Sequence, residues 1–139
     1  MEALMEQIKA VLPSIHGWCS PEKAEKLVEK ILEIQPELCV EIGVFGGSSL
    51  IPQAMALKQN GKGMIFGIDP WTTDAALEEM ISKENKDWWG KTNLNEIYRH
   101  CKTNLKKLGL EPYCTLLKSK SEKVVDCFAN NSIDVLHID

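Results

Sequence analysis

The sequence lacks the features that mark several large classes of protein. Its sixteen basic residues form no run or stripe and are outnumbered by twenty acidic residues, so the net charge is −4 and a nucleic acid partner is disfavoured. No apolar stretch approaches the roughly 20 residues of a membrane span. The N-terminal segment carries acids where a signal peptide needs positive charge. We therefore expect a cytoplasmic protein with no nucleic acid partner and no membrane partner.

Cysteine is present, but not in a pattern that forms disulfides or zinc sites. The five cysteines are odd in number, widely scattered and never in CxxC spacing, which fits a reducing cytosol. Hydrophobic residues make up 44% of the 139 positions, which is ordinary for one globular domain. We expect a single domain over residues 1–139 that includes an N-terminal helical segment over residues 1–35.

Helix signals alternate with short apolar runs along the chain. Ser20 and Pro21 are typical of a helix start, and Pro36 stops the apolar periodicity that follows. The other expected helices cover residues 48–59, 93–108 and 119–129, and the expected strands cover residues 38–42, 63–69, 113–118 and 133–139. This order predicts an α/β fold, a Rossmann-like, doubly wound parallel sheet with strand order 3-2-1-4 that is truncated after its fourth strand. An exposed edge on that last strand would favour a homo-oligomer.

The segment between the second and third expected strands is longer than the usual connection in an α/β unit. It predicts a helical insertion, with one helix over residues 74–83 and a stronger one over residues 93–108. Trp88 and Trp89 lie between these helices. They fit either an anchor that holds the loop to the body or a wall of a ligand pocket.

Polar side chains follow the ends of all four expected strands, at Glu41, Asp69, Lys118 to Ser121, and Asp139. Ligands of open parallel sheets bind in the crevice beyond these carboxyl ends. Glycines after the first strand let the backbone approach a ligand, and Asp69, 26 residues after Gly43, is placed to accept hydrogen bonds from ribose hydroxyls. The pattern predicts a nucleoside-containing ligand. The alternative is that the glycines only permit tight packing of strand and helix.

The glycine pattern disfavours a dinucleotide. Phe45 occupies the position where the second glycine of the fingerprint G-x-G-x-x-G meets a pyrophosphate. Glu41 would repel a pyrophosphate but suits a ligand with an ammonium group. S-adenosylmethionine has such a group together with a ribose, while an NAD(P)-binding half-domain stays as a less favoured alternative.

Three motifs, "EIGVFGGSS", "GIDPW" and "IDVLHID", resemble those of the class I S-adenosylmethionine-dependent methyltransferases. The branch they resemble acts on small molecules, as O-methyltransferases do. The resemblance covers residues 18–139 and the N-terminal half of that domain. It implies S-adenosylmethionine as cofactor and the following cofactor-binding residues: Glu41, Gly43, Phe45, Gly47, Ser48, Asp69, Pro70, Trp71, Ser119 and Ser121.

Asp139 ends the last motif. In related metal-dependent enzymes the acid at this place is a divalent metal ligand, so the resemblance implies a catalytic role for Asp139 and a role as a ligand of Mg²⁺, with the other ligands beyond residue 139. The alternative is a strand-end acid that contacts cofactor or water. His137 is expected to be packed and hydrogen-bonded. Trp18 is expected to staple the following helix, with a place over the cofactor mouth as the alternative.

Together these features predict methyl transfer from S-adenosylmethionine to a small-molecule substrate, with a hydroxyl oxygen as the acceptor. Positioning supplies much of the acceleration of such a displacement, so the lack of a strong catalytic base does not count against it. The alternative from another class is a non-catalytic cofactor-binding or interaction fragment that lacks the substrate half.

Overall fold

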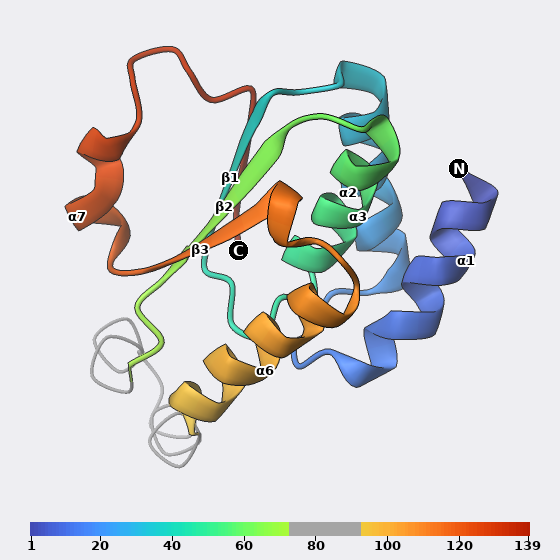
Figure 1. Ribbon diagram of the computed structural model, residues 1–139, viewed down its shortest axis with the longest axis horizontal. Coiled ribbons are helices and arrows are strands. Elements are labelled where there is room, and N and C mark those ends of the chain that lie inside the picture. Colours follow the sequence, from blue (N-terminus) through green and yellow to red (C-terminus); the bar gives the residue numbers. More distant parts are fainter. Residues whose placement is uncertain (73–92) are drawn as a thin grey trace.

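Four parallel strands form the centre of the computed structural model, which describes residues 1–72 and 93–139 (Figure 1). The strands are β1 (Leu38–Ile42), β2 (Met64–Asp69), β3 (Cys114–Lys118) and β4 (Val135–Ile138). Their order in the sheet is β3-β2-β1-β4. The predicted Rossmann-like sheet and its strand order are confirmed.

The register brings the carboxyl ends of the strands to one edge of the sheet. Ile42 of β1 pairs with Ile68 of β2 and with Ile138 of β4, and Asp69 pairs with Lys118 of β3. Because all neighbours run parallel, the segments that follow β1, β2 and β3 emerge side by side. This edge is the place where an open parallel sheet binds its ligand.

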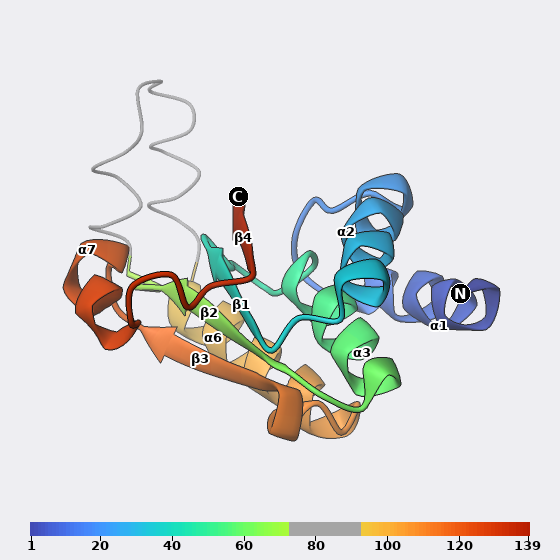
Figure 2. The same cartoon turned by 90° about the horizontal axis from the view of Figure 1, so that it is seen from above.

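Helices flank the sheet on both sides. In Figure 1, α1, α2 and α3 lie on one side of the strands and α7 on the other, and Figure 2 shows α6 next to β2 and β3. The helical elements are α1 (Glu2–Val11), η1 (Leu12–Ser14), α2 (Pro21–Ile34), α3 (Leu50–Asn60), α6 (Leu94–Lys107), η2 (Glu111–Tyr113), α7 (Ser121–Val124) and η3 (Val125–Cys127).

Two of the helices begin where their capping residues predict. Ser20 Oγ accepts a hydrogen bond from Lys23 N at 3.1 Å before α2, and Asn93 Oδ1 accepts one from Glu96 N at 3.1 Å before α6. Both helices bury one apolar stripe. The core therefore lies between α1, α2, α3 and α6 and the face of the sheet that they cover, and its fully buried side chains include Ile8, Val28, Leu50, Leu57 and Ile65.

The helix predicted over residues 119–129 is shorter than expected. Only Ser121–Val124 is α-helical, followed by the single turn of η3. The expected capping box does not form, because Ser119 Oγ donates to the carbonyl of Lys120 and no side chain caps the helix. The helix predicted over residues 74–83 and the pair Trp88 and Trp89 lie outside the described residues.

The last strand presents apolar side chains to solvent. Leu136 is 52% exposed and Ile138 is 68% exposed, and β4 pairs with β1. Their neighbours in sequence, Val135 and His137, face the other side of the sheet and are half-buried. Over residues 1–72 and 93–139 there is no helix with both the length and the apolar character that crossing a bilayer requires.

Candidate functional site

The glycine turn after β1 is tied to the end of β2. The Asp69 Oδ2 atom accepts hydrogen bonds from the backbone N–H groups of Val44 and Phe45, both at 3.0 Å. Gly43 N donates to the carbonyl of Ile68 at 2.9 Å, and Ser119 N donates to the carbonyl of Asp69 at 3.1 Å. Three of the four strand ends are therefore connected through Asp69 and the residue before it.

The Asp69 carboxylate keeps part of its capacity to accept hydrogen bonds. Besides the two contacts of Oδ2, Oδ1 accepts from Trp71 N at 2.8 Å. A carboxylate offers about four lone-pair sites, so three protein donors leave room for one more. The side chain is half-buried at the carboxyl edge of the sheet. Asp69 thus both holds the turn and offers an acceptor at the edge of the sheet. Its predicted contact with a ribose stays a prediction.

The predicted cofactor-binding residues divide into two groups. One group is half-exposed along the edge: Gly43, Phe45, Asp69, Pro70, Ser119 and Ser121. The other is buried beneath it: Glu41, Gly47, Ser48 and Trp71. The first group can contact a ligand directly, and the second supports the backbone that carries the first.

Protein packing explains part of the glycine pattern. A Cβ atom on Gly46 would collide with the carbonyl of His16, and one on Gly47, whose φ is +91°, would lie 2.9 Å from Cys101 Sγ. These two glycines are therefore needed by the fold itself, as the packing alternative expects. They do not by themselves indicate a ligand.

Glu41 is the centre of a buried polar network. Its Oε1 atom accepts from Ser49 Oγ at 2.7 Å and from Gln53 Nε2 at 3.0 Å, and it lies 2.6 Å from His137 Nδ1. The side chain is 0% exposed, and burial raises the pKa of its carboxyl group while the bonds to His137 and Ser49 act in the opposite direction. Glu41 lies under the glycine turn and faces α3, so its predicted contact with an ammonium group stays a prediction.

Asp139 follows β4 and contacts two other elements. Its Oδ1 atom lies 2.8 Å from Lys23 Nζ on α2, and its Oδ2 atom lies 3.2 Å from Ser49 Oγ, whose single hydrogen also makes the shorter bond to Glu41. The hydrogen bond that Lys23 donates to the Asp139 carboxylate raises the pKa of the Lys23 ammonium group. Through Ser49, Asp139 is connected to the Glu41 network.

The described residues do not fit a divalent cation at Asp139. Its Oδ1 atom accepts from the ammonium group of Lys23, which a cation would repel, and its Oδ2 atom lies against the Ser49 hydroxyl. Within residues 1–72 and 93–139, no group of three or more His, Cys, Asp or Glu side chains is placed to bind a metal. The structure gives no support to Mg²⁺ at this site.

Two tryptophans contact the glycine turn, each through Phe45. Trp71, predicted to border an adenine ring, is 2% exposed, and its Nε1–H donates to the carbonyl of Phe45 at 2.7 Å. Phe45 itself stacks on Trp18, with ring centroids 5.0 Å apart. Trp71 thus anchors the glycine turn from inside, and Trp18 contacts the turn from outside.

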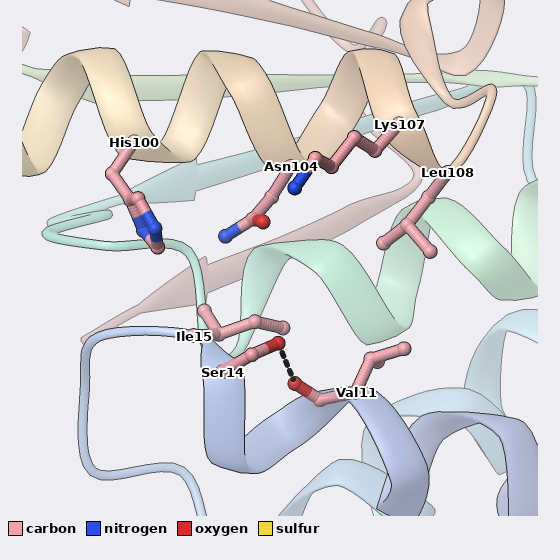
Figure 3. A pocket seen from close by; sticks show the side chains of 7 residues that line it. All are labelled: Val11, Ser14, Ile15, His100, Asn104, Lys107 and Leu108. Carbon is pink, nitrogen blue, oxygen red and sulfur yellow. Dashed lines mark hydrogen bonds between the residues drawn. The ribbon is translucent and has the colours of Figure 1, made fainter.

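A cavity of about 200 Å³ lies on another part of the molecule (Figure 3). It is lined by Val11, Ser14, Ile15, His100, Asn104, Lys107 and Leu108. These residues come from the ends of α1 and η1 and from α6, and none of them follows a strand. The cavity is therefore separate from the edge that the sequence predicted as the site.

Sequence reasoning missed several residues of the site. Ser49, the residue before α3, and Gln53 lie four residues apart in an apolar stretch of the sequence, and polar side chains at this spacing on the buried face of a helix indicate a shared partner. Lys23 lies on the exposed part of α2, where nothing in the sequence distinguishes it from other surface lysines.

Comparison with known proteins connects this edge to one family. A family model described as a methyltransferase domain matches residues 40–139. Among curated proteins, none matches the chain.

Three solved structures have the same fold over nearly the whole chain. The methyltransferase PaMTH1 of Podospora anserina with bound S-adenosylhomocysteine is 13% identical, with a TM-score of 0.62, and the match covers 99% of this chain and 48% of that one. Cofactor-bound Rv0187 from MTB is 15% identical, with a TM-score of 0.62 and coverage of 99% and 53%. The O-methyltransferase from Bacillus cereus in complex with S-adenosylhomocysteine is 17% identical, with a TM-score of 0.58 and coverage of 99% and 54%. The chain thus spans about half the length of these structures.

Proposed function

The chain belongs to the methyltransferase domain family and has the fold of the class I S-adenosylmethionine-dependent enzymes, and from this premise we propose that it binds S-adenosylmethionine at the carboxyl edge of its sheet. In the longer proteins that it resembles, we propose that this half serves methyl transfer to the hydroxyl oxygen of a small molecule. The observation that carries the proposal is the position of Asp69, a half-exposed acid hydrogen-bonded to the glycine turn.

The donor and acceptor groups along the edge suit the cofactor. Asp69 offers an acceptor to ribose hydroxyls, and Ser119 and Ser121 follow the neighbouring strand, where they can border the base. Pro70 and Phe45 add half-exposed apolar surface next to Asp69, Pro70 in sequence and Phe45 through its hydrogen bond. When bound, the cofactor supplies an electrophilic methyl group on a sulfonium. The residues of this chain hold it in place, and positioning of that kind accounts for much of the acceleration of a displacement.

Asp139 is the candidate for orienting the acceptor. It stands at the end of β4, beside the glycine turn, where the ion pair with Lys23 holds its Oδ1 atom and its Oδ2 atom lies 3.2 Å from Ser49 Oγ. The Lys23 ammonium balances the negative charge of Asp139 there. A carboxylate held in this way can accept a hydrogen bond from the hydroxyl group of the acceptor. This bond would fix the direction of the lone pair on the hydroxyl oxygen.

Calorimetric titration with S-adenosylhomocysteine tests the proposal. We expect Asp69→Ala to weaken binding more than tenfold, because the ribose hydroxyls lose their acceptor and the turn loses two hydrogen bonds. Asp69→Asn keeps the size of the side chain and separates the loss of charge from the loss of the turn. The matched control is Glu37→Ala, which removes an exposed acid at the opposite end of β1.

The outcomes separate the competing functions. Unchanged affinity in Asp69→Ala would overturn the role of that residue, and no binding by the wild-type chain would overturn the cofactor. Tight binding without methyl transfer to hydroxyl compounds would favour a non-catalytic binding module.

A further inference from the structure

The segment between η1 and α2, residues 15–20, lies directly on the glycine turn. Cys19 N donates to Ser48 Oγ at 3.2 Å. Gly17, whose φ is +142°, has no room for a side chain because a Cβ atom there would collide with Ser48 Oγ. Gly46 packs just as closely on the carbonyl of His16. The N-terminal segment and the turn therefore form one packed unit.

The indole of Trp18 is the exposed part of this unit. Its side chain lies 5.0 Å from the Phe45 ring, measured between centroids, with an angle of 26° between the planes. The residue is still 71% exposed, so most of its surface faces outward. This excludes the expected staple of α2 as its main contact, since a stapling side chain is buried against the helix.

The backbone fixes where the Phe45 ring points. Phe45 has a φ of +53°, in the left-handed region that side chains other than glycine rarely adopt. It is held there by Asp69 Oδ2, which accepts from its N–H, and by Trp71 Nε1, which donates to its carbonyl. Strain of this kind persists where the surroundings enforce it and is common at ligand sites. The bonds with Asp69 and Trp71 therefore hold the backbone of Phe45, on whose ring Trp18 stacks, in one conformation.

Phe45 connects the two parts of the edge that the proposed ligand would contact. In the proposed function, Asp69 would contact the ribose and the turn that begins at Gly43 would contact the amino acid end. Phe45 lies in the middle of this turn, and its N–H donates to Asp69. The sulfonium of S-adenosylmethionine lies between its ribose and its amino acid chain. A cation placed there would meet the face of the Trp18 indole that Phe45 does not cover, and tryptophan attracts cations more strongly than the other aromatic side chains.

We propose that Trp18 and Phe45 form an aromatic wall that recognises the positive charge of the sulfonium and so favours S-adenosylmethionine over its neutral product, S-adenosylhomocysteine. This inference rests on the proposed function, because it assumes that the edge binds this cofactor. The N-terminal segment then helps to select S-adenosylmethionine and to release S-adenosylhomocysteine.

Titration of both ligands into wild type and Trp18 variants tests the wall. We expect Trp18→Ala and Trp18→Leu to weaken S-adenosylmethionine about threefold to tenfold more than S-adenosylhomocysteine, since both lose the aromatic face. Trp18→Leu keeps an apolar side chain, so it controls for packing. Trp18→Phe keeps a ring and should retain most of the discrimination. Circular dichroism confirms that each variant is folded, which the 71% exposure of Trp18 favours.

The other possible outcomes would contradict either the aromatic wall or the binding of the cofactor. Equal losses for both ligands would mean that Trp18 contributes packing and not charge recognition, and unchanged affinities would mean that it does not touch the ligand. Either result overturns the aromatic wall and leaves the proposed function standing. If the wild-type chain binds neither ligand, the proposed function and the wall fall together.

Discussion

At the scale of single residues, the buried carboxylate of Glu41 makes stability depend on pH in an unusual direction. Burial raises its pKa above the value of about 4.5 expected for an exposed glutamate. The folded state then binds the proton more tightly than the unfolded state does, so the free energy of unfolding falls as pH rises from about 4.5 through the raised pKa. Most buried acids with strong partners act in the opposite sense.

Glu41→Gln should remove this dependence while keeping the shape of the side chain. We expect the stability of the variant relative to wild type to rise as the pH increases from about 4.5 through the raised pKa, by about 1.4 kcal/mol for each unit by which the pKa is raised. Urea unfolding across this range measures it. The absolute stability of the variant also reflects its altered bonds to Ser49 and His137, so the slope is the quantity to compare.

Asp134 provides a control of opposite sign. Its Oδ2 atom accepts from the backbone N–H groups of Glu37 and Leu38, and these bonds lower its pKa. Its contribution to stability is present above the unfolded pKa and is lost as pH falls through the lowered value. Asp134→Asn should therefore lose stability relative to wild type at neutral pH and not at acid pH. Parallel slopes for the two variants would contradict the assignment for Glu41.

At the scale of elements, α2 carries Lys23 and follows the segment that contains Trp18, so its first turn positions both. Ser20 caps this turn through Lys23 N. We expect Ser20→Ala to lower the free energy of unfolding by about 1 kcal/mol and Ser20→Asp to preserve it, because aspartate caps as well as serine does. Urea midpoints measure both variants. Equal midpoints for wild type and Ser20→Ala would show that tertiary packing alone holds the start of α2.

The elements also show where prediction from sequence succeeds. β1 begins and ends at the predicted residues, and α6 begins after its predicted cap, because periodicity and capping are local properties. The helix after Ser119 was predicted too long. Its capping pattern was present in the sequence, but the Ser119 hydroxyl bonded elsewhere. A capping pattern predicts a helix start more reliably than it predicts helix length.

At the scale of the whole molecule, the edge of the sheet was predictable and its internal bonding was not. The order of strands places Asp69 and Asp139 at one edge, and this follows from topology alone. The bonds from Trp71 to Phe45, from Lys23 to Asp139 and from His137 to Glu41 join positions 26 to 116 residues apart. Pairs so distant depend on the exact packing of the helices on the sheet, which no local pattern records.

The outer strand predicts how the isolated chain behaves in solution. Leu136 and Ile138 point to the same side of β4 and are more than half exposed, and apolar side chains on an edge strand promote pairing between chains. We expect size-exclusion chromatography with light scattering to find a molar mass above that of the monomer, rising with concentration. The double variant Leu136→Thr and Ile138→Thr places a β-branched side chain at both positions while reducing the apolar surface of the strand, and it should shift the distribution toward monomer. Ile34→Thr, which changes an exposed side chain on α2, is the matched control and should leave association unchanged. A wild-type chain that stays monomeric at high concentration would contradict association through β4.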